Sequence, residues 1–167
     1  NEGIICLSGC VSSEFNRAIL RGGATEHALD EACEVASWFH GVFGDRYFIE
    51  IQNNGLEIQQ QAMQGAVDVA KRMGLPLVAT CDAHYINQED AEAQDILLCI
   101  NTGKFRTDAN RMRMENDQFY LRSPEEMYST FTDFEDAVRR SQEIADSVDI
   151  NLELGQRHFP VYDVPPE

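Results

Sequence analysis

The sequence predicts an α/β fold with a parallel sheet, because short apolar runs alternate with longer helical patterns. Three runs have the length of buried strands and contain β-branched or aromatic residues: 4–7 (IICL), 47–51 (YFIEI) and 76–80 (PLVAT). Apolar residues recur at helical spacing in the stretches that separate them. This alternation indicates a succession of βαβ units, whose strands run parallel.

The helices between the strands are defined by their apolar faces. The face of the first is formed by Ala28, Leu29, Ala32, Val35, Ala36 and Phe39. The face of the second is formed by Ile58, Ala62, Ala66, Ala70 and Met73. The second helix should end at Gly74, which can adopt the left-handed cap, and Pro76 prevents its continuation.

Further elements follow the third strand. The pattern predicts a helix near 88–100 and a short strand over 119–121. Ser123 with Glu126 forms a capping box, and Thr132 with Glu135 repeats this signal for the last helix. The proline-rich tail is expected to be a linker or a run into another domain.

The charge balance limits the class of function. The chain carries 13 basic and 29 acidic residues, a net charge of -16, which repels phosphate backbones and argues against tight, unaided nucleic-acid binding. A metallophosphoesterase remains possible, since bound metal ions supply positive charge locally. Five cysteines without a CxxC motif indicate reduced thiols in a cytosolic protein, and the sequence contains no membrane-spanning apolar segment. The chain enters an apolar strand without an initiator methionine, so we expect it to be the middle of a larger protein.

Polar residues follow each predicted strand, at the edge where chemistry gathers in parallel sheets. The third strand is followed by Asp82-x-His84, and in an extended segment two such residues share a face and can converge on one ion. Carboxylate and imidazole suit Zn²⁺, Mn²⁺ or Fe²⁺, although Asp82 could instead be an N-cap. Cys10, after the first strand, is either a further ligand or a core residue. Glu50 is a ligand or, as we favour, a hydrogen-bond anchor.

The remaining candidates have structural interpretations. His27 and His40 are expected to face solvent, and His158 is expected to pack in the tail or to contact a neighbouring domain. The cysteines expected in core positions are Cys6, Cys33 and Cys99. The basic cluster is expected to be a solvated loop, with a phosphate or domain contact as the alternative: Lys104, Arg106, Arg111 and Arg113.

Four segments, covering essentially the whole chain, resemble the bacterial DNA polymerase III alpha-subunit family: 4–14 (IICLSGCVSSE), 48–56 (FIEIQNNGL), 75–100 (LPLVATCDAHYINQEDAEAQDILLCI) and 110–128 (NRMRMENDQFYLRSPEEMY). The resemblance implies part of a distorted (β/α)7 barrel, the PHP (polymerase and histidinol phosphatase) domain. Its C-terminal part would occupy 1–100, its end and a helical connecting region 101–155, and a run into the polymerase core 156–167.

The resemblance also implies a function. The parent would perform template-directed DNA synthesis with deoxynucleoside triphosphates and Mg²⁺, in the cytoplasm, with a sliding clamp and a proofreading subunit as partners. The PHP domain would be a metal-dependent 3′→5′ exonuclease, with Zn²⁺ or Mn²⁺ held by Cys10, Asp82 and His84. The alternatives are a metal-free scaffold that docks the proofreading subunit, and a free-standing PHP phosphatase.

Two departures from the family are visible. Family members often carry histidine where this chain has Asn54, so any role of an imidazole there is lost. The early ligands of the family would lie upstream of Asn1. Three ligands can hold one ion at best, and we therefore expect the fragment alone to be inactive.

Overall fold

The computed structural model of the protein describes residues 3–23, 25–157 and 159–160. In this part of the chain, a sheet of three parallel strands has the order β1–β2–β3. The strands are β1 (Cys6–Leu7), β2 (Tyr47–Gln52) and β3 (Leu77–Thr80). The predicted α/β class and the parallel strand direction are therefore confirmed.

β2 is the central strand and organises the core. Its residues alternate in burial, and Tyr47, Ile49 and Ile51 are buried against the helices. β1 is shorter than predicted: Ile4 and Ile5 lie outside the ladder, and Ile4 is 54% exposed. Burial of apolar side chains from both sheet and helices provides the main stabilising contribution in this region.

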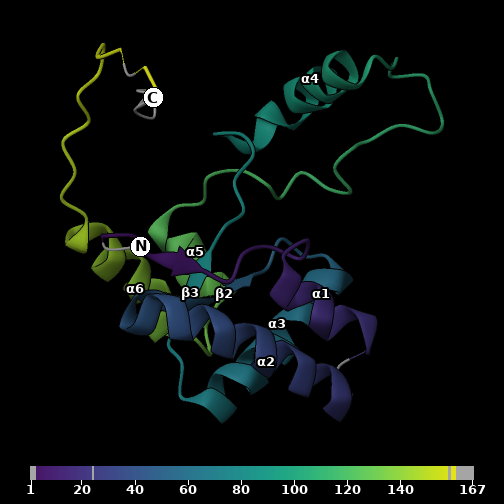
Figure 1. The fold of residues 1–167 in the computed structure, drawn as a ribbon. Coiled ribbons are helices and arrows are strands. Elements are labelled where there is room, and N and C mark those ends of the chain that lie inside the picture. The colour runs from purple at the N-terminus through teal and green to yellow at the C-terminus, as the bar shows by residue number, and fades with distance from the viewer. Residues whose placement is uncertain (1–2, 24, 158, 161–167) are drawn as a thin grey trace, which may run out of the picture.

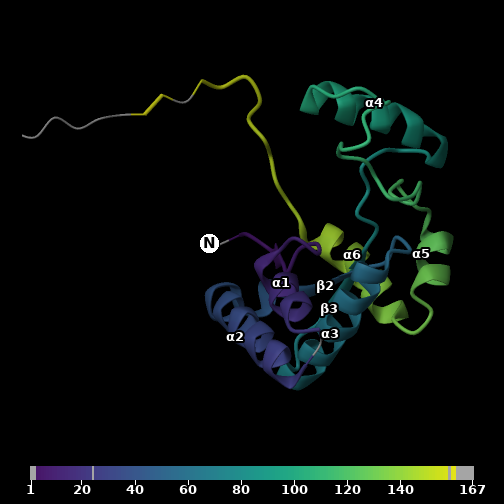
Figure 2. The ribbon, with the colours of Figure 1, turned by 90° about the vertical axis from the view of Figure 1, so that its right-hand side faces the viewer.

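Three helices, α1 (Glu14–Arg21), α2 (Glu26–Phe43) and α3 (Glu57–Met73), pack together beside the sheet (Figures 1 and 2). The apolar face predicted for α2 is confirmed, and so is the end of α3, where Gly74 has a φ of +66°. The face predicted for α3 is wrong at its first residue. Ile58 is 45% exposed and the polar Gln59 is buried in its place.

The second half of the described chain contains α4 (Ala91–Thr102), α5 (Pro124–Thr130) and α6 (Glu135–Ser147), and the 3₁₀ helices Gly44–Arg46 and Gln88–Asp90 complete the elements. α6 packs against β3, whereas α4 stands apart from the sheet and its helices in both views (Figures 1 and 2). The capping box of α5 is confirmed. None of the helices in the described ranges is long and apolar enough to cross a membrane.

Two predictions in this half are wrong. The expected strand 119–121 is a single bridge between Tyr85 and Tyr120. The second capping box is absent from the described helix end, because α6 has Phe134 at its N-cap position and no side-chain cap bond.

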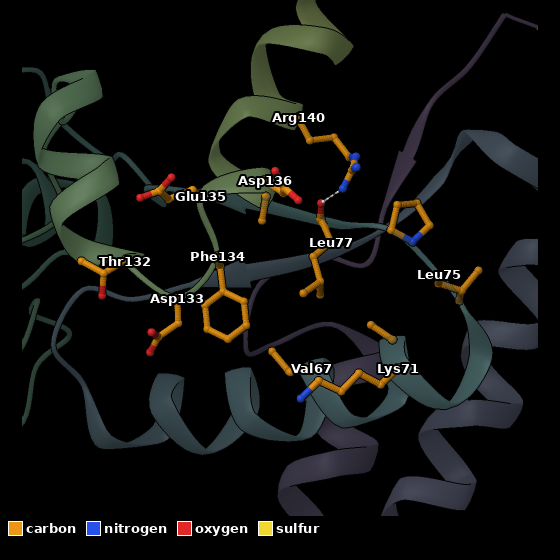
Figure 3. A pocket seen from close by; sticks show the side chains of 13 residues that line it. Val67, Lys71, Leu75, Leu77, Thr132, Asp133, Phe134, Glu135, Asp136 and Arg140 are labelled. Carbon is orange, nitrogen blue, oxygen red and sulfur yellow. Dashed lines mark hydrogen bonds between the residues drawn. The ribbon is translucent and has the colours of Figure 1, made fainter.

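A cavity of about 680 Å³ lies between α3 and α6, at the amino end of β3 (Figure 3). Arg140 of α6 donates a hydrogen bond to the carbonyl oxygen of Leu77, the first residue of β3, at 3.0 Å. The cavity therefore belongs to the opposite end of the strand from Asp82 and His84, and it is not the site that the sequence predicts.

Candidate metal centre

The carboxyl ends of the strands are tied together by Glu50. One of its carboxylate oxygens accepts a hydrogen bond from the backbone N–H of Gly9, at 3.1 Å. The other accepts from Thr80 Oγ1 at 2.5 Å and from Gln52 Nε2 at 3.0 Å. Glu50 thus links the loop after β1 to the end of β3, which confirms its interpretation as a hydrogen-bond anchor.

Asp82 and His84 lie in irregular backbone after β3, and not in an extended strand. Asp82 has a φ of +50°, in the left-handed region, which aspartate tolerates better than most residues. The extended segment assumed from the sequence therefore ends before Asp82. The carboxylate oxygen Oδ1 of Asp82 nevertheless lies 4.0 Å from Nδ1 of His84.

The imidazole of His84 is held in one orientation. Its Nδ1 lies 2.8 Å from the backbone carbonyl oxygen of Asp82. Since a carbonyl oxygen only accepts, Nδ1 carries the proton in this bond, and Nε2 of the neutral ring keeps its lone pair for a ligand. The ring packs edge-on against Phe119, with 5.5 Å between the ring centroids, and the side chain is 40% exposed.

The backbone of His84 is held as well. Its N–H donates to the carbonyl oxygen of Phe119 at 2.7 Å. Metal-bound histidines usually donate their second ring nitrogen to a carbonyl or carboxylate, and Nδ1 of His84 has such a carbonyl partner. Asp82 and His84 fit Zn²⁺ or Mn²⁺ by their donor chemistry.

Cys10 is a half-buried free thiol in the loop after β1. Within the described residues, no three side chains of histidine, cysteine, aspartate or glutamate are grouped so as to hold a metal ion. The structure therefore pairs Asp82 with His84 but does not join Cys10 to them. The ligand set of Cys10, Asp82 and His84 stays a prediction.

A buried amide network behind the pair was not predicted. Asn54, in the loop between β2 and α3, is 0% exposed, and Gln59 at the start of α3 is 2% exposed. Both side chains make hydrogen bonds close to Asp82. The only sequence signal is the amide-rich stretch that follows β2 (QNNGLEIQQQ), in which nothing distinguishes the buried amides from the exposed ones.

The other candidates have local roles. His27 is exposed beside Glu31, as predicted. His40 is half-buried, with Nδ1 3.2 Å from the carbonyl oxygen of Gly44, so the solvent-facing prediction was wrong. His158 lies outside the described residues.

The cysteines predicted in core positions are buried or packed against the core. Cys99 is buried, Cys6 and Cys33 pack against the core, and burial raises the pKa of the thiols of Cys6 and Cys33. These thiols are correspondingly poor thiolates at neutral pH.

Two of the four residues of the basic cluster, Arg106 and Arg111, pair with carboxylates of α4. Arg111 lies 2.5 Å from Asp95, and Arg106 lies 2.7 Å from Glu92. The Arg111 guanidinium lowers the pKa of the Asp95 carboxyl. These two arginines fasten the loop after α4 to the helix and are engaged within the chain.

Part of the chain matches a known family model. Residues 1–54 match the family model for the PHP domain, a range that includes Cys10 and ends before Asp82 and His84. The matched range contains β1 and β2, and β3 lies beyond it.

Relatives extend the match to the whole chain. The chain is 39% identical to DNA polymerase III subunit alpha of Treponema pallidum, over 99% of this chain and 14% of that protein. It is 37% identical to the subunit of Thermus aquaticus, over 98% and 13%, and 35% identical to that of Escherichia coli K12, over 97% and 14%. The chain belongs to the DNA polymerase III alpha-subunit family, and it spans about a seventh of the length of these relatives.

Proposed function

We propose that the chain is part of a subunit that performs template-directed DNA synthesis from deoxynucleoside triphosphates, with Mg²⁺ at a polymerase site outside these residues. The support is the match of essentially the whole chain to proteins named DNA polymerase III subunit alpha. The subunit would act in the cytoplasm with DNA, a sliding clamp and a proofreading subunit. Within it, 1–100 would complete a PHP domain, 101–155 would connect, and 156–167 would run into the polymerase core.

We further propose that the carboxyl edge of the sheet contributes to a metal-dependent 3′→5′ exonuclease. The observation that carries this proposal is the contact of His84 Nδ1 with the Asp82 carbonyl oxygen, which leaves Nε2 as the nitrogen that can bind an ion, next to a carboxylate whose Oδ1 lies 4.0 Å from Nδ1. Asp82 would offer a carboxylate oxygen and His84 its Nε2 to Zn²⁺ or Mn²⁺, with Cys10 as a third ligand. When bound, such an ion neutralises phosphoryl oxygens and lowers the pKa of an attacking water.

The acidic surface makes an ion necessary for this chemistry. With a net charge of -16, the chain repels a phosphodiester, and Arg106 and Arg111 near α4 are already paired with carboxylates. A metal ion bound by Asp82 and His84 would attract the 3′ end of the DNA to this edge of the sheet.

A metal-free scaffold that docks the proofreading subunit is the second candidate. It is favoured by the absence of a three-residue ligand group within the described residues. A free-standing PHP phosphatase is disfavoured, because the polymerase relatives match the second half of the chain as well as the first.

The substitution His84→Ala in the full-length subunit separates the two candidates. We expect it to reduce Mn²⁺-dependent degradation of single-stranded DNA from the 3′ end by at least about ten-fold, as loss of a metal ligand should, while DNA synthesis is retained. The matched control is His27→Ala, which removes an exposed imidazole of α2 that contacts Glu31. Degradation that His84→Ala leaves unchanged would favour the scaffold.

A further inference from the structure

Asn54 joins two segments that are distant in the sequence. Its side-chain nitrogen Nδ2 donates to the carbonyl oxygen of Cys81 at 2.8 Å and to that of Gln118 at 2.7 Å. Both hydrogens of the amide are therefore used. Cys81 directly precedes Asp82, and Gln118 directly precedes Phe119, so one buried side chain fastens the two pieces of backbone on which His84 depends.

The other end of the Asn54 side chain is fixed by α3. Gln59 Oε1 accepts from the backbone N–H of Asn54 at 2.7 Å, and Gln59 Nε2 donates to Asn54 Oδ1 at 2.9 Å. Gln59 Nε2 also lies 3.5 Å from Asp82 Oδ2, a long and weak hydrogen bond. The two reciprocal bonds fix the orientation of the Asn54 amide. We call these two residues the amide pair of Asn54 and Gln59.

The positions of Asp82 and His84 depend on the backbone segments that Asn54 holds. The N–H of His84 is bonded to Phe119, its ring rests on Phe119, and its Nδ1 is bonded to the carbonyl oxygen of Asp82. A displacement of either segment would separate the two side chains or turn the imidazole. The carbonyls of Cys81 and Gln118 are partly buried, and the loss of a donor there costs free energy, so Asn54 restrains both segments.

We propose that Asn54, oriented by Gln59, is a positioning residue that sets the geometry of the Asp82–His84 pair toward a metal ion. The inference rests on the proposed function of that pair as ligands. Asn54 is not itself a metal ligand, because its Nδ2 donates hydrogen bonds to two carbonyl oxygens and its Oδ1 accepts one from Gln59. It acts only through the backbone that carries the ligands.

The test is the substitution Asn54→Asp in the full-length subunit, with Co²⁺ as the probe. Aspartate has the same shape but cannot donate to Cys81 and Gln118. The matched control is Asn53→Asp, which adds the same charge one residue earlier, where the oxygen that accepts from the Gly55 N–H is retained. We expect Asn54→Asp to weaken Co²⁺ binding about ten- to 100-fold relative to Asn53→Asp, the range for groups that orient ligands.

The visible spectrum of the Co²⁺ complex gives a second readout, which a merely stabilising residue would not change. At saturating Co²⁺, the d–d bands of Asn54→Asp should differ from those of the wild type, since the bands report ligand geometry. Equal affinities and superimposable spectra for the two aspartate variants would overturn the proposal.

A second pair of variants tests the proposal if the Asn54→Asp variant does not fold. Gln59→Met removes the amide that orients Asn54 without adding charge, and Gln60→Met makes the same change at the exposed neighbouring position. We expect weaker Co²⁺ binding for Gln59→Met only; equal binding by both methionine variants would overturn the proposal.

His84→Ala separates this inference from the proposed function. If His84→Ala weakens Co²⁺ binding and the amide-pair variants do not, the positioning role alone is wrong. If His84→Ala leaves Co²⁺ binding unchanged, the ligand role of the pair is wrong and the positioning role falls with it.

Discussion

At the residue scale, the Asp82–His84 pair illustrates what spacing can and cannot predict. Their position after β3 follows from the apolar run that precedes them, and it was correctly predicted. Their convergence was argued from an extended backbone, yet the backbone at Asp82 has a φ of +50° and is not extended. The contacts that hold this segment come from Asn54 and Phe119, 28 or more positions away, and no local pattern encodes such contacts.

A second residue-scale feature is the carboxylate of Glu126. It accepts hydrogen bonds from the hydroxyl of Tyr120 at 2.7 Å and from the N–H of Ser123 at 2.8 Å. The Tyr120 bond first, and then the Ser123 bonds, lower the pKa of Glu126 from its ordinary value of 4.5. A lowered folded-state pKa means that this carboxylate stabilises the fold above its unfolded pKa, and that the contribution is lost as the pH falls through the lower folded pKa.

We therefore predict that α5 opens more readily as the pH falls below about 4.5, the ordinary pKa of glutamate. Hydrogen exchange of the α5 amides, corrected for the intrinsic rate at each pH, measures this opening. Glu126→Gln should flatten the pH dependence, because the amide does not titrate in this range. The exposed neighbour substitution Glu125→Gln should preserve it, and a flat profile in that variant would refute the assignment to Glu126.

At the element scale, the apolar face of α2 and the end of α3 were predictable, whereas α1 was not. α1 has eight residues, and it is held by burial of Phe15, Ala18 and Ile19 against its neighbours. Such a short helix depends on tertiary packing more than on its own propensity. The capping box expected at Thr132 is absent. Threonine and similar cap residues are also common in turns, so their presence does not specify where a helix begins.

The packing of α1 on α3 requires a glycine. A Cβ atom at Gly65 would lie 2.4 Å from Cγ2 of Ile19, closer than two carbon atoms can approach. We predict that Gly65→Ala destabilises the fold by about 1–2 kcal/mol, since overpacking outweighs the better helix propensity of alanine. Denaturant unfolding or local hydrogen exchange of α1 measures the change.

The matched control is Gly41→Ala, in α2. No heavy atom of the described neighbours lies within 4 Å of a Cβ at this position. It should therefore stabilise the helix by about 0.5–1 kcal/mol. Equal effects of the two alanines would contradict the packing argument.

At the scale of the whole molecule, the parallel sheet and its polar carboxyl edge followed from the alternation of strands and helices. The separation of α4 from the sheet (Figure 2) did not, because its residues Ile96, Leu97 and Ile100 are apolar and yet exposed. Burial in the sequence pattern was inferred from hydropathy alone, and hydropathy does not specify the surface that covers an apolar face.

The central claim is that Asp82 and His84 are metal ligands in the full-length subunit. Anomalous X-ray diffraction from crystals of that subunit grown with Zn²⁺ tests it most directly. We predict a zinc peak about 2.0–2.2 Å from His84 Nε2 and from a carboxylate oxygen of Asp82. A stoichiometric zinc peak bound by other residues, with Asp82 and His84 in contact only with protein, would contradict it.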